Sequence, residues 1–340
     1  MRFTIKNNIL SIFYITIALL QFNFSYSSSL FKEITQKYKN VSVLVTGGCG
    51  FIGSHIVEKL VACGADVTVL DNLSTGSKNN IISVEDKITY INGDITDFNT
   101  CLLATSNKSI IFHLAAFVSV PASTIDPRAC HLANVTGTQN LLEAARINNV
   151  KRFVFSSSCA VYGESAALCS ETTQLSPASP YGFSKLIGEI YCADYAHSFD
   201  METVAMRYFN VYGPRQNPHG SYAGVIAKFS YNMEHNLPLV IFGDGLQTRD
   251  FVSVDSVVKA NLLLGMCDKK LIQAEVFNIA SGKSVTLLEI IDELKKKYKN
   301  YEEDVIFMPA RPGDVKHVAA DCSKYNDLKN ILKQQSYNYE

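Results

Sequence analysis

Short runs of β-branched and aromatic residues alternate with helix-length amphipathic stretches from residue 41 onward. The runs predict strands at 41–46, 67–70, 88–91, 110–113, 152–156 and 203–208. The stretches between them predict helices that include 52–62, 129–148 and 181–198. Strands separated by crossover helices form parallel sheets, and strands that are apolar on both faces are covered on both sides. We therefore predict an α/β fold with a doubly wound parallel sheet.

The pattern loosens after Gly213 and resumes in part at 252–266, at 276–279 and in a charged helix at 287–298. This change predicts a second, smaller α/β lobe, laid over the carboxyl edge of the sheet. The expected division is a first domain at 41–208 that carries the chemistry and a lobe mainly at 209–322. Some segments of that lobe are expected to return to the first domain. Residues 323–340 are predicted to form an atypical tail.

The first 30 residues read as a hydrophobic leader. Arg2 and Lys6 precede an apolar run at 9–20, and small residues follow at 25–29, which is the layout of a secretory signal peptide. The run is shorter than the roughly 20 apolar residues that span a bilayer. The alternatives are a misassigned start and a membrane-associating segment at 9–24, and we expect a cytoplasmic catalytic domain.

Composition removes several classes of function. Hydrophobic residues make up 47% of the chain and charged residues 19%, as in globular proteins. Lys and Arg number 31 against 32 Asp and Glu, so the chain has no excess of positive charge that would indicate binding to nucleic acid. The nine cysteines are scattered singly without a C-x-x-C pair, which indicates reduced thiols and no metal site.

A glycine-rich turn follows the first predicted strand and opens the first helix. It places Gly47, Gly50 and Gly53 at G-x-x-G-x-x-G spacing. Glycines at such a turn let a pyrophosphate approach the backbone at the start of the helix, as in the Rossmann fold. The plainer interpretation is an ordinary tight turn between strand and helix.

Asp71 ends the second predicted strand, eighteen residues beyond Gly53. A carboxylate there can accept hydrogen bonds from both hydroxyls of an adenosine ribose. No Arg follows within 72–76 to pair with a 2′-phosphate, so the sequence favours NAD over NADP. Asp94 and Ile95 after the third strand, and 114–116 after the fourth, are further cofactor candidates; each is also typical of simple packing at a strand end.

Tyr181 and Lys185 stand four residues apart on one face of a predicted helix. An ammonium there stabilises the phenolate electrostatically and can hold the cofactor ribose, so the phenol becomes usable as a base. Ser158, 23 residues before Tyr181, ends the preceding strand and presents a hydroxyl near the same place. The spacing therefore predicts a Ser-Tyr-Lys catalytic site.

Taken together, these motifs resemble the NAD-dependent epimerase/dehydratase family of extended short-chain dehydrogenase/reductases. The resemblance rests on the glycine turn, Asp71, 134–138, 156–163, the Y-x-x-x-K pair and 207–215, and it covers about 41–321. Within the family it is most similar to UDP-glucose and UDP-N-acetylglucosamine 4-epimerases. It implies Ser158, Tyr181 and Lys185 as catalytic residues. It also implies NAD binding by Gly47, Gly50, Phe51, Ile52, Gly53, Asp71, Asn72, Asp94, Ile95, Leu114, Ala115, Ala116, Asn134, Tyr181, Lys185 and Tyr208.

The resemblance also implies residues that hold a UDP-sugar. They are Ser119, Ser158, Asn210, Val225, Val240, Phe242, Arg249, Arg311, Asp314 and Val318. Within this set the arginines match diphosphate ligands, and Phe242 matches a ring that stacks on uracil. Alternatives stay open, because Arg249 beside Asp250 is also typical of a surface ion pair, Phe242 of core packing and Ser119 of a solvated loop.

Local residues narrow the expected reaction. Similar 4,6-dehydratases carry an Asp-Glu pair directly after the catalytic hydroxyl residue, where this chain has Cys159 and Ala160. Oxidation and re-reduction at carbon 4 remain as the expected chemistry. In similar epimerases a bulky Tyr at the position of Val318 excludes an N-acetyl group, so the resemblance implies that the smaller Val318 leaves room for one. The alternatives are a UDP-glucuronate 4-epimerase and a non-catalytic NAD-binding regulatory module. The resemblance further implies a homodimer, and 323–340 lacks the Gly-Trp motif and closing helix of similar proteins.

Overall fold

The computed structural model describes residues 28–164, 168–219, 224–310 and 319–337. The predicted leader lies outside these residues apart from its last three positions, 28–30. Among the residues described, no helix has the length and apolar character needed to cross a membrane. The nine cysteines all lie in the described part and form no disulfide.

The centre of the molecule is a seven-stranded sheet in the order β11–β7–β5–β4–β1–β2–β3. Every neighbouring pair is parallel. The strands are β1 (Ser42–Thr46), β2 (Asp66–Asp71), β3 (Ile88–Asn92), β4 (Ile110–His113), β5 (Arg152–Ser158), β7 (Glu202–Tyr208) and β11 (Glu275–Ile279). The predicted doubly wound parallel sheet is confirmed. Its order reverses between β1 and β4, which is where such sheets bind ligands.

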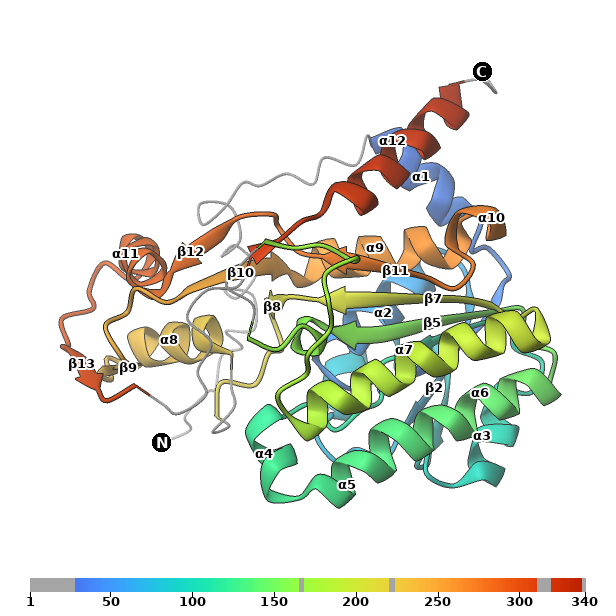
Figure 1. Ribbon diagram of the computed structural model, residues 1–340, viewed down its shortest axis with the longest axis horizontal. Helices are drawn as coiled ribbons and strands as arrows, with labels where there is room; N and C mark the ends of the chain where they lie inside the picture. The colour runs from blue at the N-terminus through green and yellow to red at the C-terminus, as the bar shows by residue number, and fades with distance from the viewer. Residues whose placement is uncertain (1–27, 165–167, 220–223, 311–318, 338–340) are drawn as a thin grey trace, which may run out of the picture.

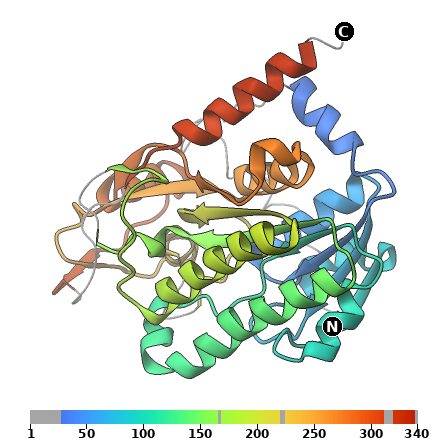
Figure 2. The ribbon, with the colours of Figure 1, turned by 45° about the vertical axis from the view of Figure 1, so that its right-hand side comes forward.

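Helices cover both faces of the sheet (Figures 1 and 2). Side chains alternate along β1: Val43 and Val45 join the core on one face, and Leu44 joins the core on the other. The first core is closed by α1 (Ser28–Gln36), α2 (Phe51–Ala62) and α9 (Val254–Met266). The second is closed by α3 (Phe98–Thr105), α6 (Gly137–Ile147) and α7 (Pro180–Phe199).

The helix predicted at 129–148 is interrupted. It consists of α5 (Pro127–His131), a π-helical turn at Leu132–Thr136 and α6. Asp126 caps the start by accepting a hydrogen bond from the Ala129 N–H, 2.9 Å away. An apolar period does not reveal an extra residue inserted into a turn, so the sequence could not show this break.

The second lobe lies beyond the carboxyl ends of β5 and β7 (Figure 1). Its own core includes Phe229, Ile241 and Ile290. Two small sheets and two helices enclose that core. They are β8 (Asn210–Tyr212), β10 (Thr248–Ser253) and β12 (Ser284–Thr286), β9 (Leu239–Phe242) paired with β13 (Val305–Met308), and α8 (Val225–Glu234) and α11 (Leu287–Lys297).

Shorter elements complete the connections. They are the 3₁₀ segments η2 (Lys78–Lys87) and η4 (Cys159–Val161), the helices α4 (Val120–Ile125) and α10 (Lys269–Ile272), and the strand pair β6 (Leu168–Cys169) and β14 (Ala319–Ala320).

The two terminal helices lie side by side in Figures 1 and 2. The expectation that 323–340 lacks a closing helix is wrong, because α12 (Ser323–Tyr337) buries Tyr325 and Leu328 in the same core as α1. Apolar residues spaced three apart, Tyr325 and Leu328, pack this helix although the chain lacks the Gly-Trp motif. The leader boundary is also wrong, since Leu30 is a core residue of α1.

Candidate active site

The glycine turn between β1 and α2 is too tight for side chains. Gly47 has φ +69°, and a Cβ there would lie 2.7 Å from the Ala115 nitrogen. A Cβ at Gly53 would lie 2.1 Å from the Gly47 oxygen. Gly50 is the N-cap of α2 and offers no side-chain hydrogen bond. The first N–H groups of α2, which include those of Phe51 and Ile52, therefore remain available to an anion.

Asp71 lies beside this turn at the end of β2. Its side chain is buried, and Oδ2 accepts a hydrogen bond from the Cys49 N–H at 2.9 Å. Oδ1 accepts one from the Leu73 N–H at 2.8 Å. A carboxylate offers about four lone-pair sites, so two remain for a ligand. Asp71 thus fixes the glycine turn and can still accept from ribose hydroxyls.

The neighbouring candidates gather at the end of β3. Asn72 Nδ2 donates to Asp94 Oδ2 at 2.7 Å, and the Thr96 N–H donates to Asp94 Oδ1 at 2.8 Å. Burial alone would raise the pKa of Asp94, but these hydrogen bonds outweigh it and the pKa is lowered. Ile95 is a packing residue here, because its side chain lies where a Cβ on Gly137 would stand.

The turn after β4 closes on the glycine turn from the other side. The Leu114 N–H donates to the Thr46 oxygen at 3.1 Å, and the Ala115 N–H donates to Thr46 Oγ1 at 3.2 Å. Ala116 is half-buried and completes this turn. The predicted residues 114–116 therefore border the same space as Gly47.

Asn134 lies in the π-helical turn and holds this region together. Its Oδ1 accepts from the Phe117 N–H at 2.6 Å, and its Nδ2 donates to the Phe117 oxygen and to Ser184 Oγ. The side chain is 2% exposed. Asn134 therefore positions the segment after β4 against α7 with an amide that is already engaged.

The three predicted catalytic side chains come together where β5 ends and α7 begins. The Ser158 hydroxyl hydrogen-bonds the Tyr181 phenol. The Tyr181 N–H donates to Ser123 Oγ at 3.1 Å. Lys185, one turn further on and 4% exposed, donates from Nζ to the Ser156 oxygen at 2.8 Å and lies 5.9 Å from the centre of the Tyr181 ring.

Burial governs the ionisation of this group. It raises the pKa of Tyr181 to about 12, and the Ser158 hydrogen bond opposes that rise. It lowers the pKa of Lys185 to about 8. The Lys185 ammonium is bonded to the backbone of Ser156, and the Ser158 hydrogen bond is the interaction that lowers the pKa of Tyr181.

A buried ion pair fixes α7 against the sheet behind these residues. Arg207 on β7 and Glu189 on α7 are 2.7 Å apart, with side chains 4% and 5% exposed. Ser157 Oγ also donates to Glu189, and Arg207 donates to the Tyr162 hydroxyl at 2.9 Å. The pair therefore joins α7, β5 and β7 directly beneath Ser158 and Lys185.

Tyr208 forms a second link at the end of β7. Its hydroxyl contacts Ser156 Oγ at 3.1 Å and accepts from Asn261 Nδ2 on α9 at 2.8 Å. Tyr208 is thus held beside the same residue whose carbonyl binds Lys185.

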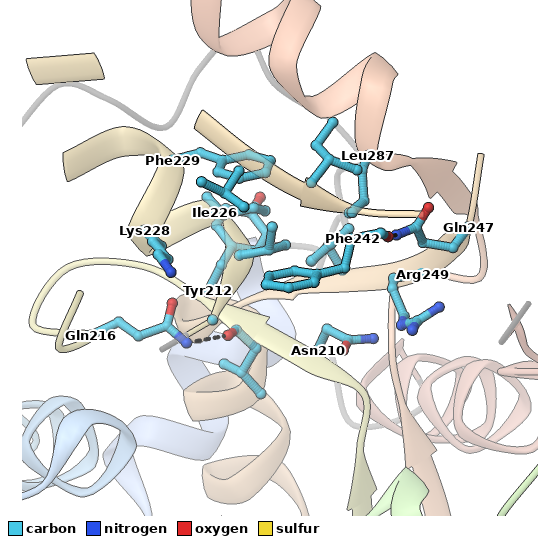
Figure 3. Close-up of a pocket in the computed structure, with 16 residues that line it drawn as sticks. Asn210, Tyr212, Gln216, Ile226, Lys228, Phe229, Phe242, Gln247, Arg249 and Leu287 are labelled. Atoms are coloured by element: carbon cyan, nitrogen blue, oxygen red, sulfur yellow. Dashed lines mark hydrogen bonds between the residues drawn. The ribbon is translucent and has the colours of Figure 1, made fainter. Parts of the chain in front are cut away.

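A pocket of about 390 Å³ opens in the second lobe (Figure 3). Five predicted substrate residues line it together: Asn210, Val225, Val240, Phe242 and Arg249. Asn210 Nδ2 donates to the Asp250 oxygen at 2.9 Å, which fixes its place between β8 and β10. Arg249 influences the ionisation of Cys159, the residue after Ser158, so the pocket adjoins the catalytic group.

Comparison with known proteins decides the family. The model of the NAD-dependent epimerase/dehydratase family matches residues 43–280. The chain belongs to this family. It is 41% identical over 289 residues to a putative UDP-glucose 4-epimerase of Methanocaldococcus jannaschii, covering 84% of this chain and 92% of that one.

Solved structures agree with this assignment. The UDP-N-acetylglucosamine 4-epimerase of Methanobrevibacter ruminantium, in complex with UDP-N-acetylmuramic acid, has a TM-score of 0.81 and 37% identity and covers 86% of this chain and 96% of its own. The UDP-glucose 4-epimerase of Thermotoga maritima, with UDP-glucose, has a TM-score of 0.79 and 35% identity and covers 88% and 99%.

The cofactor of this epimerase/dehydratase family member is NAD, and the residues present fit it. A Cβ would clash with backbone at Gly47 and Gly53 and would be tight at Gly50, 3.2 Å from the Gly47 oxygen, so this turn has the glycine requirement of a pyrophosphate-binding turn. Asp71 lies at its edge and would repel a 2′-phosphate. Among the described residues, no group of three or more His, Cys, Asp or Glu side chains is placed to hold a metal ion.

The remaining predicted residues of this family member divide into two groups. Arg311, Asp314 and Val318 lie outside the described residues. Ser119 caps α4, with Oγ accepting from the Ala122 N–H at 3.0 Å.

Asp250 is fully buried and accepts from the N–H groups of Ser281 and Gly282, so the alternative of a surface ion pair with Arg249 is wrong.

Four further side chains define the pocket, one whose role the sequence left open and three that the sequence did not indicate. Phe242, predicted as either stacking ring or core, is half-buried with its ring in the pocket. Gln216, Lys228 and Gln247 line the same space and were not predicted. A lone polar residue in a loop or on a helix carries no pattern that reveals which way it faces; the open start of α8 at Gly224 was the available signal.

Proposed function

We propose that the protein is an NAD-dependent 4-epimerase of UDP-hexoses. The proposed substrates are UDP-glucose and UDP-galactose, together with their N-acetyl forms. One observation carries the proposal: Ser158, Tyr181 and Lys185 come together at the end of β5, and Arg249 of the second-lobe pocket acts on Cys159 next to Ser158. The names of the relatives described above support the same reaction class.

The residues that follow Ser158 do not supply the acid and base that elimination of water from the sugar needs. Cys159 and Ala160 follow Ser158, and burial raises the pKa of Cys159 to about 12, so this thiol is not an acid or base at neutral pH. Oxidation followed by re-reduction at one carbon needs no further carboxylate, which favours epimerisation.

NAD, which the glycine turn and Asp71 would hold, would supply the acceptor and donor of the hydride exchanged at carbon 4 of the sugar. Tyr181, as phenolate, removes the proton of the 4-hydroxyl, and Ser158 hydrogen-bonds the same oxygen. Lys185 supplies positive charge on the far side of the phenol. When hydride returns, Tyr181 gives the proton back to the oxygen, so no group of the protein is consumed.

Binding energy in this scheme resides in the nucleotide. The Arg249 guanidinium suits phosphate oxygens, and the Phe242 ring suits a stacked uracil. The sugar then turns its other face to the cofactor without releasing the UDP portion. Val318 is proposed to leave space for an N-acetyl group, and Ser119 to contact the substituent on carbon 2.

The proposed enzyme is a homodimer with a cytoplasmic catalytic domain. The resemblance implies dimers through a helix pair. The π-helical turn at Leu132–Thr136 and helix α7 expose Leu132, Phe183 and Ile190, with exposed fractions of 43%, 54% and 57%, and apolar side chains of this kind suit such a contact. Residues 9–24 are proposed to associate with membranes. Light scattering measures the oligomeric state. The mass of the mature N-terminus shows whether the leader at 1–30 is retained.

The decisive experiment incubates the purified protein with UDP-galactose and with UDP-N-acetylgalactosamine, and separates the products. We expect the 4-epimer of each and about one NAD per chain released on denaturation. Conversion of the plain pair alone would overturn the inference from Val318. Conversion of neither, with NAD bound, would overturn the proposed reaction.

A further inference from the structure

The pocket of the second lobe, where we propose that the nucleotide binds, is called the nucleotide pocket. It contains two cationic side chains, Lys228 and Arg249, and no carboxylate among its described lining residues. Lys228 stands on the first turn of α8, four residues after Gly224. Its backbone N–H donates to the Gly224 oxygen at 3.0 Å, but within the described part of the chain its ammonium forms no hydrogen bond or ion pair. A cation that faces a pocket without a partner points to a ligand with acceptor atoms.

The two cations occupy different ends of this pocket. In Figure 3 the Phe242 ring lies between them, with Arg249 on one side and Lys228 on the other, where α8 approaches Gln216. The Arg249 end is the catalytic end, because this guanidinium influences Cys159 next to Ser158. The Lys228 end is therefore the one farther from the sugar.

Gln216 adds a second polar group at the Lys228 end. Its Nε2 donates to the Val211 oxygen at 3.0 Å, which fixes the orientation of the amide. A Cβ on Gly224 would lie 2.6 Å from that nitrogen, so the amide packs against the start of α8. Its Oε1 is buried without a hydrogen-bond partner and lies on the side facing Lys228 (Figure 3). An ammonium has three donors and can serve this oxygen and a ligand together.

We propose that Lys228 is a specificity-determining residue that binds the nucleoside end of the substrate by donating to the carbonyl oxygens of the uracil ring. Gln216 is then the positioning residue for its ammonium, and Arg249 binds the diphosphate. The inference rests on the proposed function and extends it. The order of groups in a nucleotide sugar matches the order found here: sugar at Tyr181, diphosphate at Arg249, base at Phe242 and Lys228.

Binding of uridine, UMP and UDP to the NAD-loaded protein tests this assignment, measured by calorimetry with displacement titrations for the weakest ligand. Lys228→Met should weaken all three by the same factor, about tenfold, as for a hydrogen bond from a charged donor. Arg249→Met should weaken UDP and leave uridine unchanged. Lys295→Met, on the exposed face of α11, removes the same charge without touching the pocket and should change nothing.

Two results would overturn the inference while leaving the proposed function in place. A loss confined to UMP and UDP would make Lys228 a phosphate ligand. Unchanged affinity for all three ligands would remove it from the site. If the unmodified protein bound none of the three ligands, the proposed function itself would fail. Gln216→Leu should weaken uridine in the same direction as Lys228→Met, and a loss confined to phosphorylated ligands would contradict its role.

Discussion

Tyr181 and Lys185 lie one helical turn apart, yet burial moves their pKa values in opposite directions. If Tyr181 is the base, Tyr181→Phe should lower kcat about 10³-fold, since it removes the only atom that takes the proton. Turnover of UDP-galactose measures this change. Tyr195→Phe, on the same helix with its hydroxyl bonded to Glu143, is the matched control. Equal turnover in both variants would contradict the mechanism.

The same two residues predict the pH profile. Catalysis needs Tyr181 ionised and Lys185 protonated. The ionised fraction of a phenol of pKa about 12 rises tenfold per pH unit, while the charged fraction of Lys185 falls tenfold per unit above about 8. The logarithm of kcat/KM should therefore rise up to about pH 8 and then level.

Lys185→Arg checks which group levels the profile. A guanidinium keeps its charge, so the rise should continue above pH 8 in that variant. A bell-shaped profile in the unmodified protein, or an unchanged break in the variant, would contradict the assignment.

At the scale of elements, the Arg207–Glu189 pair joins α7 to β5 and β7. Glu189→Gln leaves Arg207 charged and buried, and should lower the free energy of unfolding by about 3–5 kcal/mol. Urea unfolding measures the change. Glu143→Gln breaks a pair with Arg146 that is 39% and 32% exposed and should cost far less. Similar losses in the two variants would show that the buried pair has no special weight.

Sequence patterns located the elements that apolar periodicity determines. Five of the six predicted strands are almost entirely buried, so apolar residues occupy both of their faces, whereas β3 at the edge of the sheet is partly exposed. Pro180 after the Ser179 cap marks the start of α7. The π-helical turn at Asn134 depends on contacts with Phe117 and Ser184, which no local pattern encodes. Lys228 and Gln216 were missed for the same reason: their roles arise only when α8 and the loop after β8 meet.

Across the whole molecule, Arg215 links the two lobes. It has φ +68°, and it donates to Glu58 Oε2 at 2.6 Å and to Ser54 Oγ at 3.2 Å on α2, the cofactor helix. The next residue, Gln216, lines the pocket of the second lobe. The link therefore connects the position of α2 to the shape of that pocket.

Arg215→Met should weaken UDP binding about threefold, the size expected for a partly exposed ion pair. Glu58→Gln should cause a similar loss, and the double variant should lose no more than either single one, because both break one interaction. Calorimetry measures each affinity, with Lys296→Met on α11 as the control for a lost surface pair. Additive losses would show that the two residues act independently.

The described residues that line the pocket come from 210–287, whereas the glycine turn and the catalytic side chains come from 46–208. In the proposed enzyme, binding of the nucleotide and catalysis therefore depend on two consecutive stretches of the chain. Recombination between relatives near residue 209, or substitutions confined to one stretch, would change one of these properties and leave the other unchanged.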